Sequence, residues 1–166
     1  METSIIEVGT THEKAFVKVR GRGDFLNSQV LKDFMNTMVE KGVTDFLIDL
    51  KECKTMDSTF MGVLAGTALQ LKNKYQKKLT LFNVEEHNLQ LLTTLGIHIF
   101  LNIVTDPFST STSLNPLPAS SSSKKERAEE MLNAHTVLME ISEENKIRFK
   151  DVYEYLKEEI RKSSKG

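Results

Sequence analysis

The sequence predicts an α/β protein with a mixed β-sheet of about five strands, amphipathic helices and a C-terminal α-helical extension. Two short runs rich in Val, Ile and Phe come first, and helical and strand patterns then alternate. A segment rich in Ser and Pro separates this part from a last region with helical spacing. We therefore expect a domain over residues 1–105, a linker over 106–123 and a helical extension, a hairpin of two helices, over 124–166.

The first elements are a hairpin and a helix. The runs "SIIEVG" and "KAFVKVRG" alternate around the turn "TTHE" and predict two paired strands. In "DFLNSQVLKDFMNTMVEKG" the apolar residues recur at spacings of three and four, which predicts an amphipathic helix. Gly42 is the expected residue just past the end of that helix.

The next elements alternate. "VTDFLIDL" is apolar enough for a buried strand, and a helix is expected from about Ser58 to Tyr75. "KLTLFNV" predicts another strand, "EEHNLQLLTTLG" a short helix that ends at Gly96, and "IHIFLNIV" the last strand.

The C-terminal region begins with a composition change at Asp106, and the linker that follows holds all 3 prolines of the chain. Beyond it, two apolar stripes predict two helices, and the first stripe includes His135. Ser142 is the expected cap of the second helix. Helices this short are marginal alone, so they must pack on each other, on the domain, on a second copy in a homodimer, or on a partner. We expect a paired hairpin that lies against the domain or against another chain, and a fluctuating tail that is helical only in part is the alternative. The expected apolar contacts of the pair are Leu132, Leu138, Phe149, Val152 and Leu156.

Composition narrows the function classes. The chain has 166 residues and a formal net charge of -1, which gives no general attraction to nucleic acid or to acidic lipid. Its single cysteine, Cys53, fits a reducing compartment. The N-terminal residues lack the pattern of a signal peptide, and no apolar run is long enough to insert into a membrane. We expect a cytoplasmic location.

Enzyme signatures are weak. "GRGDF" lacks the third glycine of a dinucleotide-binding loop and the ending of a P-loop, and Ser58 lacks the glycines of a nucleophile elbow. His87 and His98 have no spacing relation to Ser58, and no cluster resembles a metal site. We therefore expect no catalytic residues, no metal, no cofactor and no enzyme activity. A nucleotide-binding or hydrolytic protein that uses "GRGD" is the weaker alternative.

One stretch resembles a known family. "FLIDLKECKTMDSTFMGVLAG" is similar to the signature region of STAS domains, the family of bacterial anti-sigma factor antagonists and of sulfate-transporter C-terminal domains. "VRGRGD" resembles the family's stretch between second strand and first helix, matched by Gly21 and Asp24. "LFNVEEHNLQLLTTLGIHIFLNI" resembles the elements that close the fold, so the likeness covers residues 3 to 105. After the serine many antagonists continue Ser-Gly, whereas this chain has Thr59-Phe60. We expect the bulky Phe60 to alter the surface around Ser58 and with it the choice of partner.

The resemblance implies an anti-sigma factor antagonist (anti-anti-sigma factor) in a partner-switching cascade that regulates transcription. The unphosphorylated form would bind an anti-sigma factor that is also a serine kinase, and phosphorylation of Ser58 would end that binding. A serine phosphatase would restore the protein, and Thr59 is the reserve phosphoacceptor. The partner-binding residues that it implies are Gly21, Asp24, Asp57, Ser58, Thr59, Phe60 and Met61. A STAS scaffold subunit of a transport or stress-signalling complex, with Ser58 as a structural residue, stays open.

Physics adds one expectation about the serine. Asp57 is a strong candidate for the N-cap of the helix, which would leave the Ser58 hydroxyl facing solvent. A helix N-terminus tolerates a phosphate, so modification should change binding and spare folding. A polar run that only caps the helix is the simpler alternative.

Overall fold

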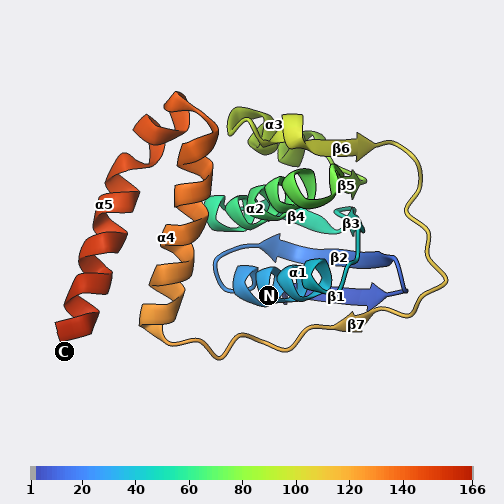
Figure 1. Cartoon of the computed structure of the whole chain (residues 1–166), viewed down its shortest axis with the longest axis horizontal. Coiled ribbons are helices and arrows are strands. Elements are labelled where there is room, and N and C mark those ends of the chain that lie inside the picture. Colours follow the sequence, from blue (N-terminus) through green and yellow to red (C-terminus); the bar gives the residue numbers. More distant parts are fainter. Residues whose placement is uncertain (1–2, 166) are drawn as a thin grey trace.

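The computed structural model describes residues 3–165 and shows helices layered on a sheet, with two further helices across one end (Figure 1). Within these residues the strands are β1 (Ile5–Thr10), β2 (Lys14–Gly23), β3 (Asp45–Asp49), β4 (Cys53–Met56), β5 (Leu79–Phe82), β6 (Leu101–Val104) and β7 (Asn115–Pro116). The helices are α1 (Ser28–Glu40), α2 (Ser58–Tyr75), α3 (Glu86–Thr94), the 3-10 helix η1 (Ile97–Phe100), α4 (Lys124–Ile141) and α5 (Glu143–Lys165).

The described strands form one mixed sheet in the order β6-β5-β3-β2-β1-β7, with the short β4 beside the end of β2. β1 runs antiparallel to β2 and to β7, whereas β3, β5 and β6 run parallel to their neighbours. β4 is also parallel to β2, and Gly23 pairs with Met56. This pairing places the end of β2 beside the start of α2.

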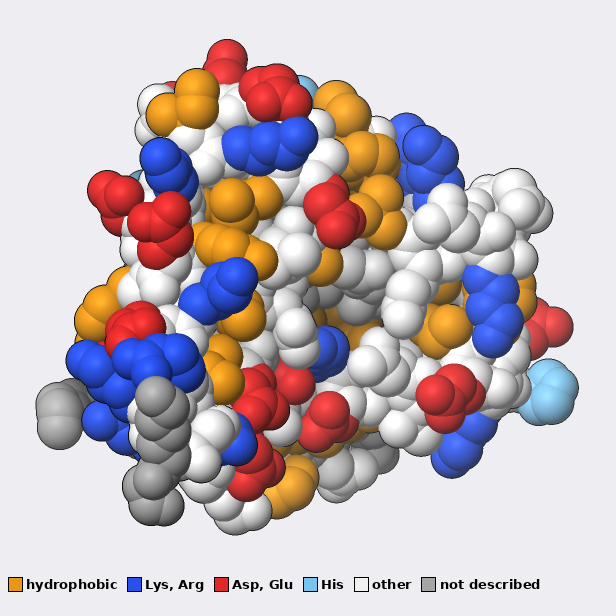
Figure 2. Space-filling model, turned by 60° about the vertical axis from the view of Figure 1, so that its left-hand side comes forward, with side chains coloured by type: hydrophobic (Ala, Val, Ile, Leu, Met, Phe, Trp, Pro, Cys, Tyr) orange, Lys and Arg blue, Asp and Glu red, His pale blue; other side chains and the backbone are white. Residues whose placement is uncertain are grey.

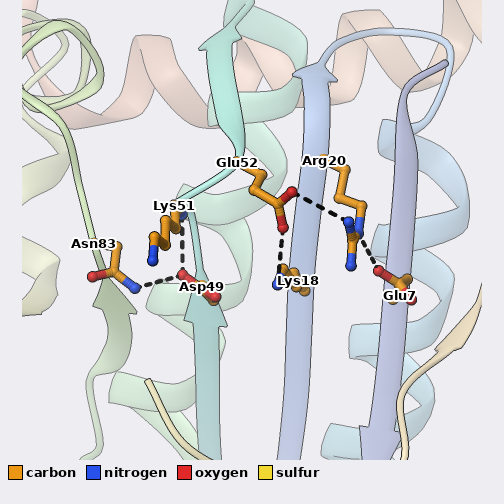
Figure 3. Close-up of polar contacts among 7 residues, drawn as sticks. All are labelled: Glu7, Lys18, Arg20, Asp49, Lys51, Glu52 and Asn83. Atoms are coloured by element: carbon orange, nitrogen blue, oxygen red, sulfur yellow. Dashed lines mark hydrogen bonds and ion pairs between the residues drawn. The ribbon is translucent and has the colours of Figure 1, made fainter. Parts of the chain in front are cut away.

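The core lies between the sheet and the helices α1 to α3. Side chains alternate along each strand, so one face of β2 is apolar and the other is polar except for Phe16. Val17 and Val19 are fully buried toward the helices, whereas Lys18 and Arg20 lie on the opposite face, in front of the strands in Figure 3. The alternation of the sequence thus decides which face of the sheet the helices cover.

The predicted fold class is confirmed, including the mixed sheet and the C-terminal helices. Gly42 follows α1 with a φ of 89°, and its N–H donates to the Val39 carbonyl, as expected for the residue that ends a helix. Ser142 caps α5, because its Oγ accepts the N–H of Asn145 at 3.1 Å.

Two local features differ from the expected elements. The run expected as one strand, 97–104, begins as η1 and becomes strand β6 only at Leu101. β4 and β7 were not expected, since each is only a few residues long and has no alternating pattern of its own. β7 pairs with β1 at the edge of the sheet.

The serine- and proline-rich segment, residues 106–123, packs along the sheet. The Phe108 ring packs edge-on against Phe16 and Phe82, with ring centroids 6.1 and 5.4 Å apart. Further on, the Leu117 N–H donates to the Ile6 carbonyl at 2.8 Å. The linker therefore covers part of the sheet face that the helices leave open.

α4 and α5 form an antiparallel pair, the C-terminal hairpin (residues 124–165), and α4 lies against α2 (Figure 1). Leu138, Phe149 and Leu156 are buried in it, as expected from the stripes. Val152 is 39% exposed, so it is less buried than the other three. Figure 2 brings the hairpin forward and shows charges of both signs around patches of apolar side chains.

Candidate functional site

The site is the junction at which β4 ends and α2 begins. Asp57 is extended there and caps the helix, since its Oδ1 accepts the Phe60 N–H at 2.9 Å. Its Oδ2 accepts the Phe25 N–H at 2.9 Å, and its own N–H donates to the Gly23 carbonyl. Burial raises the pKa of the Asp57 carboxyl, against the effect of these two backbone donors. Asp57 thus joins the α2 start to the loop after β2.

Ser58 follows as the first residue of α2, and its hydroxyl is not free. Ser58 Oγ lies 2.8 Å from Nε2 of His135, a residue of α4. The expectation of a solvent-facing hydroxyl is therefore wrong, because a second helix covers this end of α2. His135 is only 2% exposed, and its other ring nitrogen, Nδ1, lies 2.6 Å from the Met131 carbonyl oxygen.

The hydrogen-bond direction follows from the partners. A carbonyl oxygen can only accept, so Nδ1 of His135 carries the proton that is donated to Met131. In the neutral ring Nε2 is then an acceptor, and the Ser58 hydroxyl donates to it. The arrangement holds the serine hydroxyl in one direction.

Most of the neighbours of Ser58 in α2 point inward. Thr59 is 3% exposed, Phe60 is fully buried and Met61 is 4% exposed. The Phe60 ring lies under Gly23, where an added Cβ would come within 2.7 Å of it. Phe60 therefore fills the core, and the expectation that its bulk reshapes the surface around the serine is wrong. Thr59, the expected reserve phosphoacceptor, is buried, whereas Ser58 is partly exposed.

The two other predicted residues lie in different places: Gly21 is inside β2 and pairs with Cys53, whereas Asp24 lies in the loop after β2. Gly21 has a φ of 83°, and an added Cβ there would come within 2.9 Å of Ser4 Oγ. Asp24 accepts the Leu26 N–H at 3.0 Å, and its charge contributes to the raised pKa of Asp57. Asp24, Asp57 and Ser58 are thus neighbours.

Sequence reasoning missed two parts of this site. Phe25 and Leu26 were assigned to the helical stripe, yet they are 41% and 51% exposed, because α1 begins only at Ser28. His135 was assigned to an apolar stripe of the extension. A polar residue inside that stripe was the available signal, but the sequence does not say which group it faces. His87, by contrast, is exposed and hydrogen-bonded to Thr55.

A separate polar cluster lies on the open face of the sheet (Figure 3). Glu52 pairs with Lys18 at 2.9 Å and with Arg20 at 3.2 Å, and Arg20 also pairs with Glu7. The Lys18 hydrogen bond lowers the pKa of the Glu52 carboxyl. Because its two acids and two bases pair with one another, this cluster offers little net charge to a ligand, and ion pairs this exposed add little stability.

Comparison with known proteins gives the family. The model of the STAS domain described as "Mlab, STAS domain" matches residues 6–105, and the chain belongs to this family. The chain is 28% identical over 95 residues to the anti-sigma-B factor antagonist of Staphylococcus aureus (strain NCTC 8325 / PS 47), covering 57% of this chain and 87% of that protein. It is 30% identical over 98 residues to the one of Bacillus subtilis (strain 168), covering 59% and 88%.

Solved structures of anti-sigma factor antagonists share the fold. Unphosphorylated SpoIIAA superposes with a TM-score of 0.52 at 16% identity, over 61% of this chain and 89% of that one. A putative antagonist from Thermotoga maritima gives a TM-score of 0.54 at 13% identity, over 60% and 85%. The predicted resemblance is confirmed. In residues 3–165, no helix has the length and apolar character to cross a membrane.

Proposed function

We propose that this protein is an anti-sigma factor antagonist whose binding is switched by phosphorylation of Ser58. The unphosphorylated form binds an anti-sigma factor that is also a serine kinase and so frees a sigma factor. That kinase transfers the γ-phosphoryl group of ATP to Ser58 Oγ, the hydroxyl loses its proton, and ADP leaves. A serine phosphatase reverses the change. The protein is ligand and substrate, not an enzyme, and it acts in the cytoplasm.

The observation that carries this proposal is the position of Ser58. It is the first residue of α2, at the loop where Asp24 and the exposed Phe25 and Leu26 also lie. Such a loop offers a partner both apolar side chains and charge. The similarity to anti-sigma-B factor antagonists supports the same assignment.

The effect of a phosphate follows from its charge. A phosphoserine adds about -1.5 to -2 charges at neutral pH. Within the protein, the N-terminus of α2 favours such a charge, whereas Asp57 and Asp24 oppose it. Across an interface, the same group adds bulk, repulsion and a desolvation cost. Binding should therefore change much more than folding.

The test uses two baits in extracts of the native cell. Ser58→Ala should retain a serine kinase that mass spectrometry identifies, whereas Ser58→Asp should retain at least tenfold less, a loss of about 1.4 kcal/mol or more. Ser163→Asp, an exposed position on α5, is the control and should bind like the unmodified chain. With the purified kinase and ATP, phosphate should map to Ser58. Phosphate that maps only to residues 106–123 would overturn the assignment.

A STAS scaffold is the second candidate, and the hydrogen bond from Ser58 to His135 favours it. In that function the serine is structural and joins the hairpin to the domain. Ser58→Ala and Ser58→Asp would then lose stability and partner binding in parallel. Partner binding that Ser58→Ala retains and Ser58→Asp loses, although both variants lack the serine hydroxyl that bonds to His135, favours the switch.

A further inference from the structure

The face of α2 that carries Ser58 is lined by small residues. Ser58, Gly62 and Gly66 are spaced by four and therefore lie on one side of the helix. α4 crosses this side so closely that a Cβ on Gly62 would come within 2.5 Å of the Ala134 carbonyl oxygen and 2.8 Å of its Cβ. The close packing of the two backbones depends on the glycine.

α4 also places His135 directly on the serine. The imidazole is 2% exposed and lies 2.8 Å from Ser58 Oγ. Its ring packs edge-on against Phe149 of α5, with centroids 5.0 Å apart. Both helices of the hairpin thus contribute to the cover over Ser58.

Polar contacts hold the hairpin on either side of this crossing. Toward its start, Glu130 pairs with Lys32 of α1 at 2.7 Å. In the first turn of α5, the fully buried Asn145 donates to the carbonyl of Leu95, which follows α3, at 2.9 Å. The hairpin therefore spans α1, α2 and the end of α3.

The contact between hairpin and domain is incompletely packed. A pocket of about 380 Å³, open to solvent, lies among α1, α2 and α4, beside Gly62 and Gly66. Polar side chains line it together with apolar ones, and the polar set includes Asn36, Gln70, Asn73 and Asn133. Opening an interface of this kind costs less free energy than opening a dry apolar core. Residues 106–123 would keep an opened hairpin close to the domain and favour its return.

We propose that the C-terminal hairpin is an intramolecular lid on Ser58, which competes with the protein partner for the same face of α2. The inference rests on the proposed function for the identity of that partner, a serine kinase. With the hairpin docked, the serine hydroxyl is directed to His135, and α4 occupies space beside it. A phosphoryl donor needs an in-line approach to that oxygen. Phosphorylation therefore requires an opened hairpin, and the apparent affinity of the kinase falls with the fraction of closed molecules.

The experiment measures access to position 58 without a partner. Ser58→Cys is introduced into the full chain, once alone and once together with Gly62→Gln. Each protein is labelled with a small reagent, iodoacetamide, and with a large one, a maleimide on a 5-kDa polyethylene glycol. The glutamine wedges α4 from α2, since the nearest atoms to an added Cβ all belong to Ala134. Gly66→Ala is the matched control, because its Cβ would meet its nearest neighbour, Val137, at 4.0 Å. Labelling rates are measured at several pH values, and the rate constant of the thiolate form is derived for each variant. Comparing these constants removes any effect that His135 has on the ionisation of the thiol.

With Gly62→Gln, the large maleimide should react at least tenfold faster, and Gly66→Ala should leave the rate unchanged. Hydrogen exchange should show lower protection of α4 and unchanged protection of β2 and β3. Asn145→Ala, which loosens the other end of the hairpin, provides a second opening variant. Equal labelling rates in all variants would overturn the lid.

The kinase supplies a separate result. Gly62→Gln in the chain with native Ser58 should be phosphorylated faster by the purified kinase than the unmodified chain. Faster labelling with no phosphate on Ser58 from any kinase would disprove the proposed function and leave the lid standing. Equal labelling with normal phosphorylation would disprove the lid and leave the function standing.

Discussion

At the residue scale, the hydrogen bond between Ser58 and His135 joins the domain to the hairpin. Ser58→Ala removes the donor and leaves Nε2 of a ring that is 2% exposed without this partner. Because an unpaired buried polar atom is costly, we expect the free energy of unfolding to fall by about 1–3 kcal/mol in urea melts. Ser164→Ala is the control, since Ser164 is exposed and donates to a carbonyl of its own helix. Equal, small losses in both variants would show that the bond contributes little.

Cys53 tests the core beside the site. It is 1% exposed, and burial raises the pKa of its thiol to about 11. The thiolate is the reactive form, so at pH 8 the native protein should react with a disulfide reagent such as DTNB far more slowly than the denatured chain. A fast reaction of one thiol per native chain would show that β4 opens readily.

At the element scale, the two helices α2 and α3 differ in their caps. Asp57 accepts two backbone N–H groups, whereas Glu85, at the N-cap of α3, makes no side-chain cap hydrogen bond. Asp57→Ala should therefore lower the free energy of unfolding by about 2 kcal/mol, and Glu85→Ala by less than about 0.5 kcal/mol. Asp57→Asn keeps an acceptor and should fall between them. Similar values for the two alanine variants would contradict the role of the cap.

The same elements show what the sequence could predict. Asp57 and Gly42 were predictable because caps depend on the residue type at one position. The run 97–104 was not, since "IHIF" is apolar in either structure and only its packing selects the 3-10 turn. β4 and β7 are defined by pairing with distant strands, which a local pattern does not contain.

At the scale of the whole molecule, the candidate site was predicted only in part. Asp24, Asp57 and Ser58 follow from the strand–helix junction and from the family resemblance. His135 lies 77 residues from Ser58 in the sequence, and its contact depends on how the hairpin docks. The hairpin was expected to lie against the domain or against another chain, and the sequence alone does not choose between these two. An apolar stripe predicts that one face of a helix is buried. Which surface covers that face depends on shape, and here Gly62 of α2 allows Ala134 of α4 to pack closely.

Two truncations test how the parts of the molecule depend on one another. Without residues 124–166 the chain keeps β1 to β7 and the core between the sheet and α1 to α3, so we expect it to fold. Without residues 107–166 it also loses β7 and Phe108, which packs on Phe16 and Phe82. Because an apolar ring that leaves its contacts costs about 2 kcal/mol, the shorter chain should be less stable by at least that amount.

Urea melts followed by circular dichroism measure the difference, and Phe108→Ala in the full chain should reproduce most of it. Equal stability of the two truncated chains would mean that residues 107–123 are a plain tether, whereas failure of the longer one to fold would make the hairpin part of the domain core and not a lid upon it.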